Sequence, residues 1–218
     1  MSEIKAVIFD VDGTLTDTEQ YYFEAWPKAL LHFGYKASSE IVLQMRSLGR
    51  PFAVERFKEW FGPDFDYFKV REYRRELVQK LVEEHGIPLK PGVHEILAWL
   101  KEQGIVTAIA TANDRERTAV YLKKIGLDGC FDKVFCADMV QFGKPAPDIY
   151  AYACKGLGLD PSLCMAVEDS PNGVKSAYAA GCRVVMVPDL TEPDEEMKPM
   201  LYACVDGLAD IKGLIQRR

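Results

Sequence analysis

The stretch that most constrains this chain lies near its start, where a short apolar run ends on acidic residues. Ala6–Phe9 contains no polar residue, Asp10 follows it directly, and Asp12-Gly13-Thr14 comes soon after. A short, wholly apolar run is typical of a strand that is buried on both faces of a parallel sheet. Open parallel sheets bind their ligands at the carboxyl ends of such strands. We therefore expect a binding or catalytic site at Asp10.

Length and composition narrow the class of protein. The chain has 218 residues, of which 48% are hydrophobic and 28% are charged, and its formal net charge is −6. This is enough apolar material for one domain of moderate size or for a core with a smaller insert. A negatively charged chain without a basic stripe is not expected to bind nucleic acid. No apolar stretch reaches the length of a membrane span, so we expect no membrane partner.

The cysteines and the first residues bear on the location of the protein. Six cysteines are scattered singly, without the spacing of a zinc site or of a redox motif. Reduced and mostly buried thiols are then expected, as in an intracellular protein. The first residues lack the basic leader and the apolar segment of a secretory signal. We expect a cytoplasmic protein that is a monomer or a weak dimer.

Residues 17–87 differ in character from the rest of the chain, because they carry helix signals and no strand-like alternation. Helices are expected over residues 18–33 with Thr18 as the cap, 38–45 with Ser38 or Ser39 as the cap, 52–61 and 65–84. One face of the fourth helix is expected to be apolar through Val70, Tyr73, Leu77 and Leu81, with Val78 and Val82 beside it.

Prolines and glycines between Gly86 and Gly92 mark a boundary and a hinge, and residues 15–18 form the other hinge. The sequence thus predicts a core made of residues 1–16 and 88–218, and a helical cap made of residues 17–87.

From Val93 onward, helices alternate with short apolar strands. The expected helices are 93–103, 115–125, 147–155 and one from Pro171 that Gly181 ends. The expected strands are 106–110, 134–136, 164–167 and 183–187, and a weaker helix and strand close the chain. This alternation predicts the α/β class, with a parallel sheet that helices cover on both faces.

Polar side chains follow the expected strands at the points where they end. They are Asp10, Asp12, Thr111, Asn113, Glu168 and Asp169, and Lys144 lies in the loop before the 147 helix. The carboxyl ends of parallel strands share one rim of the sheet, so these residues are expected to converge. Several carboxylates in a small space need a cation among them, and a site of oxygen ligands without His or Cys favours Mg²⁺.

A lysine and a hydroxyl beside such an ion can hold a phosphate group. A carboxylate in line with that phosphate can attack it and form an acyl phosphate, which is the role expected of Asp10. Asp12 is placed to donate a proton to the leaving oxygen and to take one from water.

Each of these residues alone has a plainer structural explanation. Thr111 alone could be an ordinary hydroxyl at a strand end, and Lys144 alone could be a solvated loop lysine. Ser170 alone could be the cap of a helix that begins at Pro171. A calcium loop starting at Asp10 is excluded, because its fifth position would be Thr14 and its glycine comes too early. The whole set, however, favours a catalytic site.

These motifs give the sequence a family resemblance. Asp10-Val-Asp12-Gly-Thr14, Thr111, Gly143-Lys144-Pro145 and Val167-Glu168-Asp169-Ser170 occur in the order of the haloacid dehalogenase (HAD) superfamily. The sequence resembles most the branch that holds small-molecule phosphatases and β-phosphoglucomutase. The resemblance implies a Rossmann-like core with a helical cap, which agrees with the helical insert.

The resemblance also implies roles for individual residues. Asp10 would be the nucleophile and a metal ligand, and Asp12 the general acid and base, with its backbone carbonyl on the metal. Thr111 and Lys144 would hold the phosphoryl group, and Glu168 and Asp169 would complete a Mg²⁺ site. Further phosphate or substrate contacts are expected from Ala112, Asn113 and Arg50.

Asp12 points to phosphate-ester chemistry, because dehalogenases of the family lack an acid there. The expected activity is hydrolysis of a small phosphorylated metabolite, such as a sugar phosphate, through an aspartyl phosphate. The alternative is a β-phosphoglucomutase, although Tyr22 stands where the mutase-type histidine is expected. A non-catalytic phosphate-accepting module is a third hypothesis. Arg46 and Arg50 either bind a second phosphate or carboxylate or are solvated ends of cap helices.

Overall fold

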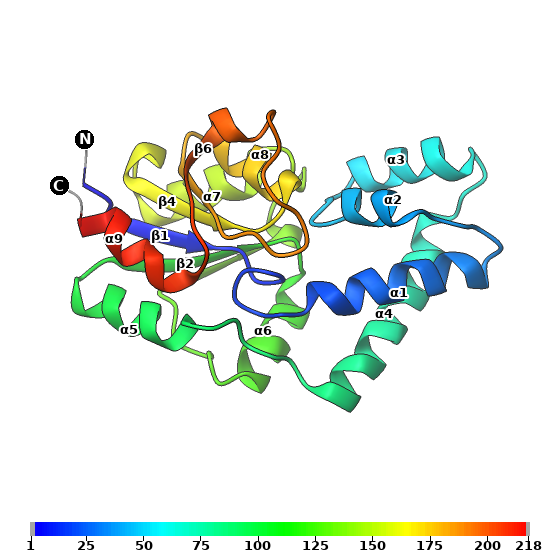
Figure 1. Ribbon diagram of the computed structural model, residues 1–218, viewed down its shortest axis with the longest axis horizontal. Helices are drawn as coiled ribbons and strands as arrows, with labels where there is room; N and C mark the ends of the chain where they lie inside the picture. The colour runs from blue at the N-terminus through cyan, green and yellow to red at the C-terminus, as the bar shows by residue number, and fades with distance from the viewer. Residues whose placement is uncertain (1–2, 217–218) are drawn as a thin grey trace.

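The computed structural model describes residues 3–216 as a parallel sheet flanked by helices, with a lobe of further helices at one end (Figure 1). The strands are β1 (Ala6–Phe9), β2 (Val106–Thr111), β3 (Lys133–Cys136), β4 (Cys164–Glu168), β5 (Arg183–Met186) and β6 (Leu201–Cys204). Their order in the sheet is β3-β2-β1-β4-β5-β6, and every neighbouring pair is parallel. The expected α/β fold with a parallel sheet is confirmed.

The sheet is covered on both faces by the core helices. These are α5 (Val93–Glu102), α6 (Arg115–Lys124), α7 (Asp148–Leu157), α8 (Pro171–Ala179) and α9 (Ile211–Gln216). Val7 and Phe9 of β1 pack in one apolar cluster with α5, α6 and α9, whereas Ala6 and Ile8 pack in the other with α7 and α8. Because β1 is buried on both faces, all its residues are apolar, which explains the run that identified it.

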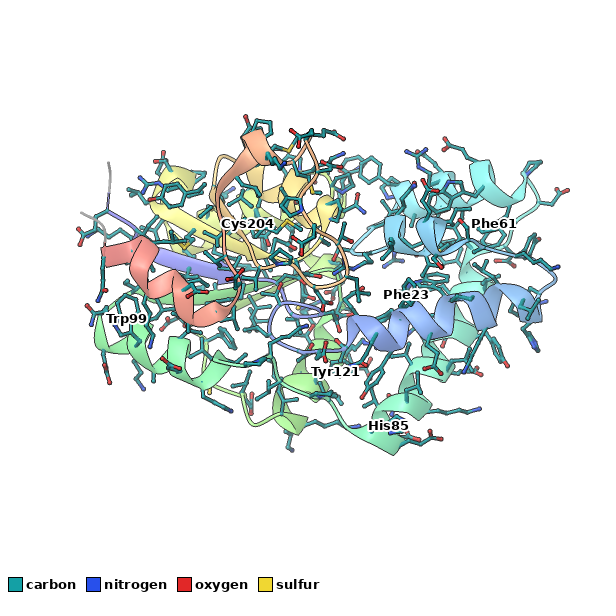
Figure 2. The ribbon with its side chains drawn as sticks, viewed as in Figure 1. Phe23, Phe61, His85, Trp99, Tyr121 and Cys204 are labelled. Atoms are coloured by element: carbon teal, nitrogen blue, oxygen red, sulfur yellow. The ribbon has the colours of Figure 1, made fainter. Side chains whose placement is uncertain are left out.

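The four cap helices lie between β1 and α5 in the chain. They are α1 (Glu19–His32), α2 (Ser39–Gln44), α3 (Phe52–Phe61) and α4 (Tyr67–His85). Figure 1 shows them at the end of the molecule toward which β1 points. An aromatic cluster that includes Trp26, Phe57 and Tyr67 fills their interior. Tyr121 of α6 packs against Tyr21 and Val78, and Figure 2 places it at the junction of cap and core.

The two segments that join the cap to the core are paired with each other. The amide of Asp17 donates to the carbonyl of Pro88 at 2.8 Å, and the amide of Lys90 donates to the carbonyl of Leu15 at 2.9 Å. Residue 17 lies in this pairing and residue 87 directly precedes it, and the division into a cap and a core at these residues stays a prediction. That the cap and core move as separate units stays a prediction.

Thr18 directly precedes α1, as predicted, but its side chain makes no capping hydrogen bond. Its hydroxyl donates to Asp12 Oδ1 at 2.5 Å instead. Ser38, in contrast, caps α2 as expected, since its Oγ accepts from the amide of Ile41 at 3.3 Å. At the end of the described chain the order also differs, because β6 precedes α9. No helix within residues 3–216 is long and apolar enough to cross a membrane.

The buried face of α4 differs from the expected one. Tyr73, Leu77 and Leu81 are only half-buried, and the deeply buried positions after Tyr67 are Val70, Arg74, Val78 and Val82. The expected apolar stripe is therefore rotated, and an arginine lies in the middle of the buried face.

Candidate active site

The ends of two neighbouring strands bring three acidic side chains together, as the sequence predicts. Asp10 follows β1, Glu168 ends β4 and Asp169 follows it. All three are buried, and one carboxylate oxygen from each lies within 4.8 Å of the other two. We call Asp10, Glu168 and Asp169 the three-carboxylate cluster. Its donors are oxygen atoms only, which suits a hard divalent cation.

Lys144 reaches this cluster from the loop before α7. Its Nζ lies 2.5 Å from Asp10 Oδ1 and 2.6 Å from Glu168 Oε1, and the side chain is buried. Burial alone would lower the pKa of Lys144, but the carboxylates of Asp10 and Glu168 raise it above its ordinary value. The lysine is therefore charged, and the alternative of a solvated loop lysine is excluded by its burial.

One lysine does not balance the carboxylates. Burial, together with Glu168 and Asp169, raises the pKa of Asp10 well above its ordinary value, against the attraction of Lys144. Burial likewise raises the pKa of Asp169, although Arg46 opposes the shift. Because the pKa values of both buried acids are raised, added positive charge would be favourable in the three-carboxylate cluster. The cluster therefore fits a divalent cation.

Asp12 stands outside the three-carboxylate cluster and is held by neutral donors. Thr18 donates to its Oδ1 at 2.5 Å, and the side-chain amide of Asn113 donates to its Oδ2 at 2.6 Å. Thr18 lies at the edge of the cap and Asn113 lies after β2, so the carboxylate is fixed from both sides. Such an acid can exchange a proton with a group bound beside it.

The other expected residues also line the space above the sheet. Thr111 is buried at the end of β2, and its Oγ1 accepts from the amide of Asn113 at 3.1 Å. Ala112 is exposed at the same wall. Arg50 is exposed, and its carbonyl accepts from the amide of Gly143 at 2.8 Å.

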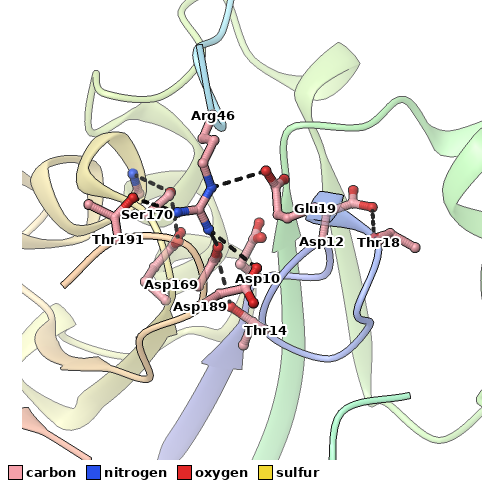
Figure 3. Close-up of polar contacts among 12 residues, drawn as sticks. Asp10, Asp12, Thr14, Thr18, Glu19, Arg46, Asp169, Ser170, Asp189 and Thr191 are labelled. Atoms are coloured by element: carbon pink, nitrogen blue, oxygen red, sulfur yellow. Dashed lines mark hydrogen bonds and ion pairs between the residues drawn. The ribbon is translucent and has the colours of Figure 1, made fainter. Parts of the chain in front are cut away.

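Arg46 is the cap residue that enters the acidic rim (Figure 3). Its guanidinium pairs with Asp169, donates to Glu19 Oε2 at 3.0 Å and donates to Thr191 Oγ1 at 2.8 Å. Burial raises the pKa of Glu19 to about 8, and Arg46 opposes that shift. Arg46 is only 5% exposed, so the alternative that it is a solvated end of a cap helix is wrong.

Two supporting residues were not found from the sequence. The phenol of Tyr150, on α7, donates to Glu168 Oε1 at 2.6 Å. Gly173, in the first turn of α8, leaves room for the same carboxylate, because a Cβ there would lie 1.9 Å from Glu168 Oε2. Ser170 does cap α8, with its Oγ accepting from the amide of Gly173 at 3.2 Å. No sequence pattern marks a helix tyrosine as a partner of a distant acid.

A cavity of about 580 Å³ lies between the cap and the rim of the sheet. Asp10, Asp12 and Thr111 line its floor, and cap residues that include Trp26 and Arg74 line its other walls. The volume is that of a small-molecule site, and polar side chains from both the core and the cap line it.

Comparison with known proteins agrees with this geometry. A family model for haloacid dehalogenase-like hydrolases matches residues 4–181. Protein CbbY from Rhodobacter capsulatus is 35% identical over 197 residues, which cover 85% of this chain and 86% of that protein. Hexitol phosphatase B from Escherichia coli K12 is 32% identical over 214 residues, which cover 96% of this chain and 91% of that protein.

Among solved structures, CbbY from Rhodobacter sphaeroides in complex with phosphate has a TM-score of 0.79 at 28% identity, covering 95% of this chain and 96% of that one. The family match spans most of the chain, and the curated relatives exceed 30% identity. The chain therefore belongs to the haloacid dehalogenase-like hydrolase family, as its motifs predict, and it is an enzyme of that family.

Proposed function

We propose that the protein is a Mg²⁺-dependent phosphatase that hydrolyses a small phosphorylated metabolite, such as a sugar phosphate, through an aspartyl phosphate on Asp10. The observation that carries the proposal is the buried Asp10 carboxylate, bound by Lys144 beside two further carboxylates at the floor of a cavity. The names of the relatives, one of which is a hexitol phosphatase, support phosphate esters of small polyols or sugars as substrates.

In the first step, an oxygen of Asp10 attacks phosphorus while the bond to the ester oxygen breaks. Asp12 donates its proton to that leaving oxygen, and Lys144 and Thr111 hold the phosphoryl oxygens. In the second step, Asp12 takes a proton from water, whose oxygen attacks phosphorus and releases phosphate and a free Asp10. Asp10, Glu168, Asp169 and the Asp12 carbonyl would hold Mg²⁺, which would offset negative charge on the phosphoryl group.

Tyr22 favours hydrolysis over the mutase reaction. Its phenol oxygen accepts from the Arg117 guanidinium at 2.7 Å. Burial raises the pKa of Tyr22 well above its ordinary value, against the charge of Arg117. A phenol held in this way is a poor proton carrier near neutral pH, so it does not replace a histidine in that role.

The proposal is tested with Asp10→Asn and with a control, Asp128→Asn, at an exposed acid. Each protein is given Mg²⁺ and a panel of sugar, polyol and nucleoside phosphates, and both phosphate release and isomerised sugar phosphate are measured. We expect Asp10→Asn to lose activity by about 10³-fold or more, because its amide is a far poorer nucleophile, while the control keeps full activity.

Wild-type turnover by Asp10→Asn would contradict the nucleophile assignment. Conversion of β-glucose 1-phosphate to the 6-phosphate, without release of phosphate, would establish the mutase instead.

A further inference from the structure

Arg46 ties the cap to the core through a single guanidinium. Its Nε donates to Glu19 Oε2 at 3.0 Å, its Nη1 donates to Thr191 Oγ1 at 2.8 Å, and its Nη2 pairs with Asp169 Oδ2 (Figure 3). The same Nη2 lies 3.6 Å from Asp189 Oδ2. Of these partners Glu19 belongs to the cap and the others to the core, so the guanidinium crosses from the cap into the acidic rim of the sheet.

Asp169 belongs both to this contact and to the three-carboxylate cluster. Its Oδ2 pairs with Arg46, and its Oδ1 accepts from the Thr14 hydroxyl at 3.2 Å. The carboxylate is fully buried. A divalent cation that binds it would lie beside the guanidinium, and two cations at one buried carboxylate repel each other strongly. Arg46 and a divalent cation are therefore alternative partners of Asp169.

The backbone that carries Arg46 is held against the core on both sides. The side-chain amide of Asn172 donates to the carbonyl of Arg46, and the amide of Gly49 donates to the carbonyl of Lys144, each at 2.8 Å. Between these contacts Ser47 has a φ of 52°, in the left-handed region that is unfavourable for a residue other than glycine. Such a conformation persists only while its surroundings hold it, so release of Arg46 would let this loop between α2 and α3 relax.

The other partners of Arg46 can be satisfied without its contact to Asp169. Glu19 is part of the cap and can move together with Arg46. Asp189 keeps an ion pair with Lys90, whose Nζ lies 2.6 Å from Asp189 Oδ1. Asp169, in contrast, would lose the guanidinium that compensates its buried charge, and a divalent cation would compensate that charge instead.

We propose that Arg46 is an internal cation that competes with the divalent cation for Asp169, so that metal binding releases the loop between α2 and α3 from the core. Arg46 is then a positioning residue, since it acts through Asp169 and decides whether the cap loop is docked. The inference rests on the part of the proposed function that places Mg²⁺ at the three-carboxylate cluster.

The first experiment measures the dissociation constant of Mg²⁺ by calorimetric titration, without substrate, of protein that EDTA has freed of metal. Arg46→Met removes the charge and keeps an unbranched side chain, and the control is Arg56→Met, at an exposed cap arginine paired with Glu59. We expect Arg46→Met to bind Mg²⁺ about tenfold more tightly, as when about one wild-type molecule in ten has Arg46 displaced before the metal arrives. The control should bind Mg²⁺ like the wild type.

Thr191→Val is a milder variant that changes no charge and nearly keeps the volume of the side chain. It removes the oxygen that accepts from Arg46 Nη1, so it should weaken the docked state by one hydrogen bond. The affinity for Mg²⁺ should then rise by about twofold to tenfold. An arginine that only supports the metal ligands would give the opposite result, because both variants would then bind Mg²⁺ more weakly.

Amide hydrogen exchange, measured by mass spectrometry on peptides that contain Gly49, follows the loop itself. Mg²⁺ should speed this exchange about tenfold in the wild type, because the amide of Gly49 loses the Lys144 carbonyl. In Arg46→Met the exchange should be fast already, and Mg²⁺ should change it by less than about twofold.

Slower exchange at Gly49 in the presence of Mg²⁺ would overturn the inference. Mg²⁺ binding that is unchanged or weaker in both Arg46→Met and Thr191→Val would also overturn it, and would leave the proposed phosphatase function intact. A wild type that binds no Mg²⁺ would overturn both the inference and the proposed Mg²⁺ dependence.

Discussion

At the scale of single residues, one carboxylate oxygen of Glu168 is held by two donors from distant parts of the chain. Lys144 and Tyr150 both bind Oε1, each at 2.6 Å, and Gly173 leaves the space that the other oxygen occupies. Lys144 contacts Asp10 as well, so its removal would disturb the proposed nucleophile too. The Tyr150 hydroxyl donates to Glu168, and Tyr150→Phe keeps the ring, whose centre lies 5.3 Å from Lys144 Nζ, so this variant is the cleaner probe of how Glu168 is held.

We predict that Tyr150→Phe weakens metal binding more than it impairs chemistry at saturating metal. The variant removes one charge-assisted hydrogen bond, so the free energy of unfolding should fall by about 1.5–3 kcal/mol. The Mg²⁺ concentration for half-maximal activity should rise about tenfold or more, because the ligand is less well oriented. Titration of activity with Mg²⁺ measures this, and Tyr152→Phe, at a side chain 44% exposed, is the control. An unchanged Mg²⁺ requirement would show that Tyr150 has no part in holding the acid.

The sequence alone predicts those site residues whose positions follow from the topology of the backbone. Asp10, Thr111 and Glu168 end strands or follow them, and parallel strands end on one rim whatever their side chains do. Tyr150 and Glu19 act from helices, where the direction of a side chain depends on how the helix packs. The burial of Arg74 on α4 is not predicted for a related reason, because a hydrophobic pattern assigns arginine to the solvent face.

At the scale of elements, the loop between α2 and α3 docks on the loop before α7. The amide of Gly49 donates to the carbonyl of Lys144, and the amide of Gly143 donates to the carbonyl of Arg50, each at 2.8 Å. The two backbones meet without side chains between them, because a Cβ on Gly49 would lie 2.5 Å from Gly143 Cα. This contact brings the cap loop to the lysine that binds Asp10.

We predict that Gly49→Ala impairs closure of the cap over the cavity without harming the fold. The added Cβ cannot fit against Gly143, and Gly49 is not among the described glycines with a positive φ, so alanine suits its backbone when the loops are apart. The value of kcat/KM should fall about tenfold or more, because closure orients the substrate and excludes water. The melting temperature should change by only a few degrees.

Gly143→Ala tests the same contact from the core side, because its Cβ would lie 2.6 Å from Gly49 Cα. Gly213→Ala is the control, since nothing lies within 4 Å of a Cβ there. Normal kinetics in both Gly49→Ala and Gly143→Ala would mean that the two loops need not meet during turnover.

The boundaries of the helices show how much of the secondary structure local sequence signals predict. The third cap helix runs over Phe52–Phe61 as expected, and the core helices differ from expectation by a few residues at most. The sequence position of Thr18 predicts a side-chain cap for α1, but its hydroxyl donates to the carboxylate of Asp12 instead. The hydrogen-bond partner of such a side chain cannot be assigned from the local sequence, because the fold brings a second partner close to it.

At the scale of the whole molecule, the cap and core enclose several carboxylates, and this couples stability to pH. The pKa of Glu19 is raised from 4.5 to about 8, chiefly by burial, and the pKa values of Asp10 and Asp169 are raised as well. A carboxyl whose pKa is raised on folding binds its proton more tightly in the folded state. For Glu19 this contribution to stability is fully present below pH 4.5 and is lost as the pH rises toward about 8.

We therefore predict that the metal-free protein loses melting temperature between about pH 5 and pH 8, and that Mg²⁺ restores it most at the upper end. A bound divalent cation offsets the carboxylates that protons no longer neutralise. At a hundred times its dissociation constant, Mg²⁺ should stabilise the fold by about 2.7 kcal/mol, or about 5–10 °C. Melting curves with EDTA or Mg²⁺ at several pH values measure this, and Asp169→Asn, which alters one proposed ligand, should lose most of the Mg²⁺ effect. A Mg²⁺ shift that is the same at pH 5 and pH 8 would mean that these carboxylates do not bind the metal.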